Sequence, residues 1–312
     1  SVITMSPSID PLEKKEKFKD KIAQFLVGRG YTEILTNSIT NSAYFSDEVL
    51  AGAVKMLNNL SADLDVMRPS MLETGLETIA YNLNRQISSI ALFEIGKVYG
   101  QSSKGAYYES EQLAIYLSGK QQQDGWRAKG VLADFFVAKG AATAIFNLLG
   151  MQAGAWKQTS THQIDYAINK KTIGHLQVIG TKKLQVFGIK QPVFYIQFDL
   201  ANLFSIYQSK QVVYQEISKY PSVERDLALV IPQDTKYEAI EACVNEAKLE
   251  ALKESRVFDI FESDKLGAQK KSVAINFVFN TADKTLTDTE IDTMMKKLVQ
   301  LFEKNLTAEV RK

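Results

Sequence analysis

The chain has 312 residues, 45% of them apolar, and its 37 basic and 36 acidic side chains leave it almost neutral. This is an average globular composition, and it excludes collagen-like, coiled-coil and disordered chains. Because no apolar stretch approaches the roughly 20 residues that cross a bilayer and Cys243 is the only cysteine, we expect no membrane partner, no disulfide and no multi-cysteine metal site, and a cytoplasmic location.

The first elements predicted along the chain are helices and buried strands. Asp10, Pro11 and Glu13 form a helix-start signature, and an apolar stripe with a 3.6-residue period runs from there to Gly28 and Gly30. Further on, we expect a strand at 31–36, a helix at 72–83, strands at 90–100 and 113–119, and a helix at 131–149.

Between 165 and 200 the pattern changes to short apolar runs typical of antiparallel strands. The expected strands lie at 165–169, 173–179, 184–189 and 194–200. We therefore predict an α+β domain at 1–207, with helices around a mostly antiparallel sheet. A more polar stretch, 208–218, is expected to link it to a second domain at 219–312.

The second domain contains a cycle of six predicted elements. They are a strand at 224–231, a helix from 236 to about 253, strands at 256–261 and 271–280, a helix opened by a capping box of Thr287 and Glu290, and a strand at 308–312. The order β-α-β-β-α-β is that of the ferredoxin-like fold.

The residue combinations that support catalysis are missing from the sequence. His162 and His175 are the only histidines, and neither has a second ligand at a spacing suited to zinc. There is no nucleophile elbow and no glycine-rich phosphate loop. We therefore expect no catalytic residue, no metal ligand and no cofactor bound by this chain.

Charge does not indicate a nucleic-acid surface either. The second domain has 15 basic and 17 acidic residues, so its net charge is near −2, and the rest of the chain carries about +3. No basic footprint is visible. A domain of this balance can still hold RNA by base stacking and shape.

Two segments resemble a known family. VMRPSMLETGLETIAYNLNRQISSIALFEIGKVY, with Arg68, the Asn-Leu-Asn-Arg run at 82–85 and the Leu-Phe-Glu-Ile-Gly strand at 92–96, closely resembles part of bacterial phenylalanyl-tRNA synthetase beta subunits. YPSVERDLALVI, followed by FDIF, KKSVAINFVF and TLTDTEI, resembles the C-terminal anticodon-binding domain of the same subunits. The resemblance covers about 5–311 and implies that the chain corresponds to the C-terminal part of such a subunit.

The resemblance implies a class II synthetase-like fold that has lost its active site, followed by a ferredoxin-fold anticodon-binding domain. A working class II site needs arginines that neutralise charge on the transferring phosphate. The segment 184–204 contains no arginine, so adenylation by this chain is not expected. The sequence THQIDYA at 161–167 also stands near the place where many members carry His-Pro-Gly-Arg. The editing modules of the family precede this region and lie outside the chain.

The resemblance also implies partners. These are the catalytic alpha subunit, in an α2β2 heterotetramer, and tRNA-Phe, while ATP and Mg²⁺ are used by the whole complex. Two other functions remain open from the sequence. The first domain could activate an amino acid with ATP by itself, or the chain could be a protein-interaction scaffold that binds no RNA.

Candidate anticodon contacts follow from strand alternation in the second domain. In a ferredoxin-like domain the helices cover one sheet face, and every second residue lines the other. We expect Phe258 and Ile260 to face the helices. The candidates for the open face are Asp226, Ala228, Asp259, Phe261, Ala274 and Asn276. A base would stack on Phe261, with Asn276 and Asp226 reading its edge.

The first helix supplies candidates for the subunit interface. Phe18, Ile22 and Phe25 form a bulky apolar stripe, and the resemblance implies that the first class II motif makes helix contacts between subunits. The alternative is that this stripe faces the sheet of its own domain.

Overall fold

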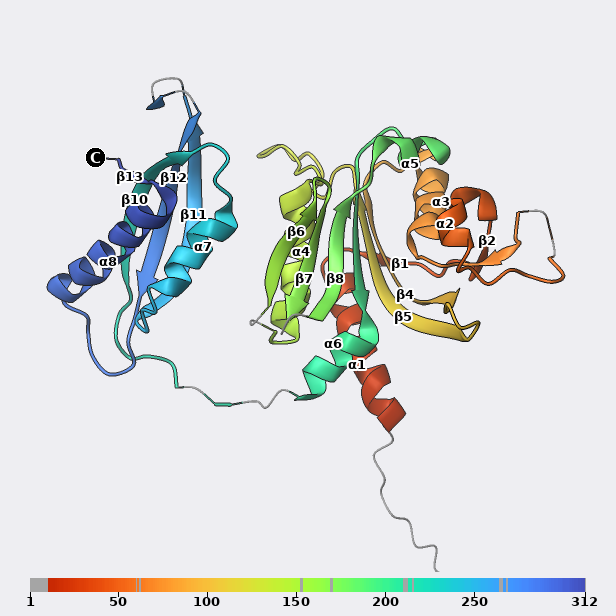
Figure 1. Cartoon of the computed structure of the whole chain (residues 1–312), viewed down its shortest axis with the longest axis horizontal. Coiled ribbons are helices and arrows are strands. Elements are labelled where there is room, and N and C mark those ends of the chain that lie inside the picture. The colour runs from red at the N-terminus through yellow and green to blue at the C-terminus, as the bar shows by residue number, and fades with distance from the viewer. Residues whose placement is uncertain are drawn as a thin grey trace, which may run out of the picture. The chain divides into compact units, whose positions relative to one another are not determined.

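The computed structural model describes residues 11–311 except 60, 62, 152, 153, 169, 170, 210–212, 215, 264, 265 and 268. It divides the chain into two compact units, Ser1–Gln211 and Val212–Lys312 (Figure 1). Two sequence expectations fall partly outside the described residues. These are the helix start at Asp10 and the linker at 210–212 and 215. No helix in the described ranges combines the length and apolarity needed to cross a bilayer.

A seven-stranded sheet forms the centre of the first unit. Its strands are β1 (Thr32–Glu33), β4 (Ile90–Gln101), β5 (Tyr107–Ser118), β6 (Ala155–Ser160), β7 (Gln163–Ile168), β8 (Lys171–Val178) and β9 (Val193–Asp199). The strand order is β1-β4-β5-β9-β8-β7-β6. Only β1 pairs in parallel, with β4, and every other neighbouring pair is antiparallel.

The helices of the first unit cover both faces of this sheet. They are α1 (Pro11–Gly28), α2 (Asp47–Leu50), α3 (Leu72–Leu83), α4 (Phe135–Leu148), α5 (Thr181–Val186) and α6 (Leu200–Ser209), with a 3-10 turn η1 (Ser42–Tyr44) and a small ladder of β2 (Ile39–Thr40) with β3 (Val66–Met67). Alternation along β5 divides the interior: Leu113 and Ile115 join the core of α1, α4 and α6, whereas Tyr116 joins that of α3 and α5.

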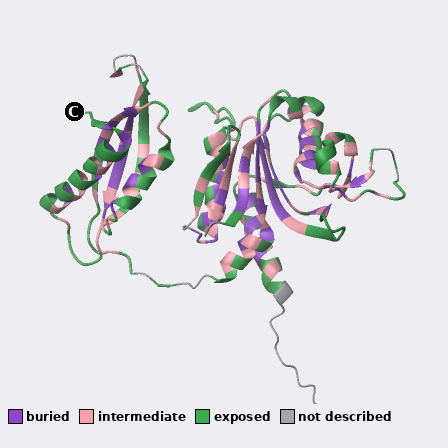
Figure 2. Cartoon of the chain, in the orientation of Figure 1, coloured by how far each residue is buried: buried purple, intermediate pink, exposed green. Residues whose placement is uncertain are grey.

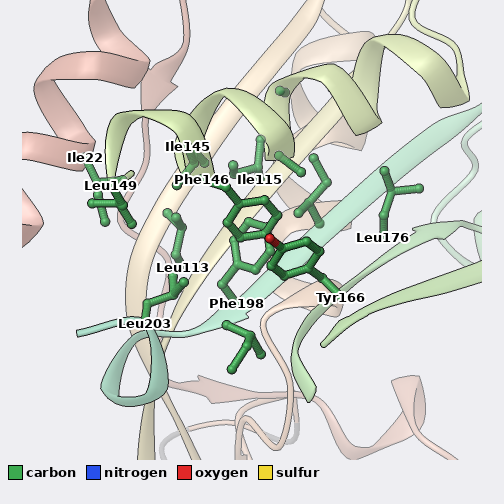
Figure 3. Packing of buried hydrophobic residues seen from close by; sticks show 14 of the residues in the cluster. Ile22, Leu113, Ile115, Ile145, Phe146, Leu149, Tyr166, Leu176, Phe198 and Leu203 are labelled. Atoms are coloured by element: carbon green, nitrogen blue, oxygen red, sulfur yellow. The ribbon is translucent and has the colours of Figure 1, made fainter. Parts of the chain in front are cut away.

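Aromatic packing fixes α4 to the sheet. The ring of Phe146 on α4 stacks on Tyr166 of β7, with centroids 3.7 Å apart, and meets Phe198 of β9 edge-on at 5.1 Å (Figure 3). These contacts lie in the middle of a continuous apolar cluster, and offset or edge-on ring pairs contribute beyond their buried area. They fix α4 against β7 and β9.

The second unit is a four-stranded sheet with two helices on one face. Its elements are β10 (Val223–Pro232), α7 (Tyr237–Glu246), β11 (Leu252–Glu262), β12 (Lys270–Phe279), α8 (Asp288–Leu306) and β13 (Glu309–Val310), in the sheet order β11-β12-β10-β13. The predicted ferredoxin-like order is confirmed, and so is the capping box of Thr287 and Glu290. Figure 2 shows the buried residues concentrated along the strands of each unit.

Several sequence expectations about these elements are wrong. The segment at 184–189 is not a strand, because Leu184 lies in α5, which ends before Gly188 at φ +68°. Helix α7 stops at Glu246, because Lys248 takes a left-handed φ of 48° and the next strand begins at Leu252. Helix α4 begins after its cap Asp134, not at 131, and β6 was missed.

Gly75 on α3 permits a close contact between this helix and the sheet. A Cβ at this position would lie 2.1 Å from the ring of Tyr116, whose hydroxyl donates to the carbonyl of Met71 at 2.5 Å. We expect Gly75→Ala to lower the free energy of unfolding of the first unit by about 1–3 kcal/mol, because the buried ring has no space to move into. Urea unfolding followed by circular dichroism measures the change.

Gly140→Ala is the matched control, because Gly140 lies within α4 and its Cβ would meet nothing within 4 Å. It should stabilise the unit by up to about 1 kcal/mol through helix propensity. Equal effects of the two variants would contradict the assignment of the Gly75 effect to packing.

Candidate functional site

One face of the second-unit sheet carries all six residues proposed from the sequence. The register pairs Asp226 with Asn276, Ala228 with Ala274, Asp259 with Ala274, and Phe261 with Ser272. Opposed residues point to the same side of a sheet, and the intervening Leu227 and Ile275 lie in the core covered by α7 and α8. We call the side opposite these helices the open face. The structure brings the six residues together there, and their contact with RNA remains a proposal.

Asn276 has a different position from the one expected of a base-reading residue. Its side chain is only 7% exposed, and its amide nitrogen donates to Glu224 Oε2 at 3.1 Å and to Asp226 Oδ1 at 2.7 Å. Both amide hydrogens therefore have partners within the sheet. Asn276 holds two carboxylates in place, and only Asp226 of the expected pair is exposed to a ligand.

Phe261 has a cationic neighbour that the sequence did not reveal. The ring is 46% exposed, and the guanidinium carbon of Arg311 lies 5.6 Å from its centroid. Arg311 follows β13 at the opposite edge of the sheet, where its amide donates to the carbonyl of Ala228 at 2.9 Å. Its side chain thus crosses the open face above small residues. Alternation places Arg311 on this face, but the pairing of β13 with β10, which directs its side chain towards Phe261, is not visible in the sequence.

The expectation that Phe258 and Ile260 face the helices holds for Ile260 by its strand register, but neither side chain is buried beneath them. Phe258 is 53% exposed and Ile260 is 58% exposed. A register shift between Val257 and Asp259 leaves Phe258 outside the ladder, as a β-bulge does. Ile260 pairs with Val273 and so shares its face, but it lies on the edge strand beyond the cover of the helices.

The arginine of the first family-like segment is part of the protein interior. Arg68 is 2% exposed and its Nη1 lies 2.9 Å from Oε1 of Glu94, which is fully buried. Its Nε donates to the carbonyl of Lys97 at 2.8 Å, and its Nη1 donates to the hydroxyl of Thr36 at 2.6 Å. The charge of Arg68 is therefore neutralised within the fold and is not available to a phosphate.

The second arginine of that segment is also engaged. Arg85 follows α3, and its guanidinium carbon lies 3.4 Å from the centroid of the Tyr81 ring, an i,i+4 neighbour. A nucleotide phosphate needs free cationic groups that converge on it. Arg68 does not fit that requirement, because it is enclosed and already paired with Glu94.

Among the described polar side chains of the first unit, His175 lies on the sheet beside an acidic residue. His175 on β8 lies opposite Asp165 of β7 and 5.8 Å from the ring of Tyr195. Burial lowers the pKa of His175, and the charge of Asp165 opposes this only in part, so the imidazole is neutral at pH 7. Among the residues that the structure describes, no cluster of three or more His, Cys, Asp and Glu side chains could hold a metal ion.

The first helix does not present its apolar stripe to a partner. Phe18 and Ile22 are 2% and 0% exposed, and Phe18 packs on Phe204 and Tyr207 from the region of α6. The expectation that Phe18 and Ile22 form a subunit interface is therefore corrected: they belong to the core of their own unit. Phe25 is half-buried and remains a candidate for such a contact.

Two family models match the chain. The model described as the phenylalanyl tRNA synthetase beta chain CLM domain matches residues 1–200, and that of the ferredoxin-fold anticodon binding domain matches residues 218–311. A solved structure of pyrrolysyl-tRNA synthetase from Desulfitobacterium hafniense is similar with a TM-score of 0.50 at 19% identity, over 63% of this chain and 67% of that chain. The predicted class II synthetase-like fold is thereby confirmed.

Curated relatives are similar over nearly the whole chain. Phenylalanine–tRNA ligase beta subunits of Bacteroides fragilis and Bacteroides thetaiotaomicron are 33% and 31% identical over 96% of this chain. That of Geobacillus kaustophilus is 28% identical over 97% of it. The match covers 39%, 39% and 38% of these relatives, so the chain spans about two fifths of the length of the curated relatives it matches.

The buried ion pair yields a stability prediction. We expect Arg68→Ala to lower the free energy of unfolding by about 3–5 kcal/mol, because it leaves the Glu94 carboxylate buried without its cation. Replacing both partners, as Arg68→Met with Glu94→Leu, should recover much of that loss, because no buried charge remains. Denaturant unfolding of the chain measures both values.

Lys97→Ala is the control for a surface ion pair, since Lys97 and Glu109 are both about half exposed. Such pairs contribute at most about 1 kcal/mol. If the double variant were no more stable than Arg68→Ala, the loss would not come from the uncompensated charge.

Proposed function

The chain belongs to the phenylalanyl-tRNA synthetase beta chain family, and on this premise we propose that it is the C-terminal part of a non-catalytic beta subunit of phenylalanine–tRNA ligase. In this proposal the first unit supports the catalytic alpha subunit, and the second unit contacts the anticodon of tRNA-Phe. The complex is an α2β2 heterotetramer in the cytoplasm, and its reaction uses ATP and Mg²⁺. The match of the anticodon-binding model to 218–311 is the observation that carries the anticodon contact.

The open face has the form that a nucleotide base requires. Ala228 and Ala274 are opposed on adjacent strands and leave the centre of the face shallow. Phe261 stands at one side of this floor with half of its ring exposed. A base can therefore lie against the sheet and stack on Phe261, a contact worth about 1–3 kcal/mol per base.

Charged groups around the floor supply the polar part of the contact. Asp226 is held by Asn276, and Asp259 lies opposite Ala274, so both carboxylates can accept from the amino or imino groups of a base. Arg311 lies over Phe261 and can cover the second face of a stacked base or pair with its phosphate. The net charge of the domain is slightly negative, so stacking and shape carry more of this contact than general attraction to RNA.

The first unit serves as a scaffold in this proposal. Arg68 is bound to Glu94, and Arg85 lies on Tyr81, so activation of an amino acid is assigned to the alpha subunit. Isothermal titration calorimetry of this chain with ATP and phenylalanine tests the division of roles. We expect no heat of specific binding, and saturable ATP binding would favour a class II enzyme domain in its own right.

We predict that Phe261→Ala in the assembled alpha–beta complex raises the KM for tRNA-Phe by roughly tenfold, as about 1.4 kcal/mol of lost stacking implies. Phenylalanine-dependent exchange of pyrophosphate into ATP should be unchanged, because that step does not use the tRNA. Steady-state aminoacylation and exchange assays measure the two quantities.

Phe258→Ala is the matched control, since Phe258 is a similarly exposed phenylalanine on the same strand but lies at the bulge outside the ladder. It should leave the KM within about twofold. An unchanged KM for Phe261→Ala, or the same rise for both variants, would remove Phe261 from the site and support a scaffold that does not bind RNA through this face.

A further inference from the structure

A hairpin between β5 and α4 projects from the first unit, and the scaffold role does not explain it. Two hydrogen bonds join its arms. The amide of Gln121 donates to the carbonyl of Val131 at 2.7 Å, and the amide of Ala133 donates to the carbonyl of Gly119 at 2.7 Å. Lys120 and Leu132 form an antiparallel bridge between them. The helix expected at 131–149 overlaps the end of this segment, which precedes the first residue of α4.

The tip of the hairpin has a fixed conformation. Asp124 accepts from the amide of Gly130 at 2.8 Å and pairs with Lys120, and the amide of Gly125 donates to the carbonyl of Ala128 at 2.9 Å. A Cβ on Gly130 would lie 2.0 Å from the carbonyl oxygen of Gln122, so only glycine allows the strands to approach this closely. A turn closed in this way presents its side chains without a large ordering cost on binding.

Trp126 stands at this tip and is 94% exposed. The guanidinium carbon of Arg127 lies 5.4 Å from its ring. Residues 120–132 contain three basic side chains and one acidic side chain, whereas the whole chain is close to neutral. Since Asp124 pairs with Lys120, the positive charges of Arg127 and Lys129 remain without an ion-pair partner among the described residues.

We propose that this hairpin tip is a second RNA-contacting site, separate from the open face, in which Trp126 stacks on an unpaired base and Arg127 and Lys129 pair with the adjacent phosphates. The proposal rests on the proposed function only for the presence of tRNA as a partner. An exposed aromatic ring beside free cations is the combination that holds single-stranded nucleic acid without reading its sequence.

A protein partner fits this tip less well. A tryptophan that anchors a protein interface is surrounded by other apolar contacts that exclude water. The neighbours of Trp126 along the loop, from Gln121 to Gly130, are glutamine, aspartate, glycine, alanine, arginine and lysine, and the exposed apolar side chains of the hairpin, Val131 and Leu132, lie on its second arm after the tip. Stacking requires only the face of the ring, and two unpaired cations favour an anionic partner.

The test is equilibrium binding of tRNA-Phe to the assembled alpha–beta complex. Trp126→Ala should weaken binding about tenfold, and Trp126→Phe should restore it to within about threefold, because a smaller ring still stacks. Arg127→Gln should reduce the slope of log K against log salt by about one, as loss of one phosphate contact requires. Tyr107→Ala, at a 72% exposed tyrosine on β5 outside the hairpin, is the control and should change neither quantity.

Phe261→Ala, measured in parallel, separates the two proposals. If it weakens tRNA binding and Trp126→Ala does not, the hairpin proposal is wrong and the proposed function stands. If neither variant has an effect, both fail. Sedimentation of the Trp126→Ala complex tests a protein contact. If the subunits associate more weakly while tRNA binding per assembled complex is unchanged, the tip is a protein contact and the inference is overturned.

Discussion

Strand alternation is the constraint on which both units depend. A strand presents successive side chains to opposite faces of its sheet, so the elements that cover each face decide which residues a ligand can reach. In the first unit α4 and α3 lie on opposite sides of β5, and Ile115 and Tyr116 enter separate cores. In the second unit α7 and α8 lie on one side only. The same rule thus produces a sheet covered on both faces in the first unit and a sheet with one open face in the second.

The buried ion pair between Arg68 and Glu94 shows how the scaffold relates to a class II site. An arginine that faces a cleft can neutralise a phosphate, but this one has a carboxylate, a carbonyl and a hydroxyl as partners. Gly96 lies against the same guanidinium, since a Cβ there would be 2.3 Å from Nη2. The charge of Arg68 therefore satisfies groups of the neighbouring strand β4. The proposed division of roles between subunits is consistent with this arrangement.

The surfaces proposed to contact RNA share a physical design. On the open face Arg311 lies over Phe261, and at the hairpin tip Arg127 lies near Trp126. In each case a guanidinium accompanies an exposed ring, although the overall charge gives no sign of nucleic-acid binding. Stacking with a local cation needs few residues, so it can be built on a nearly neutral protein. This explains why a charge count over whole domains does not detect such sites.

The sequence by itself determined the order of the elements in the second unit, the capping box of Thr287 and the alternation that places Ala228 and Ala274 on one face, because these features depend on local hydrogen bonds and a two-residue period. Tertiary structure alone decided the rest of the site. The bulge at Phe258 changed the exposure of β11, and the pairing of β13 with β10 placed Arg311 on the same face as Phe261. From the sequence, the apolar stripe with Phe18 could face either a partner subunit or its own sheet. The packing of Phe18 against Phe204 places it in the core of its own unit. Each of these outcomes depends on contacts between residues that are far apart in the chain, and the periodicity of the sequence does not specify such contacts.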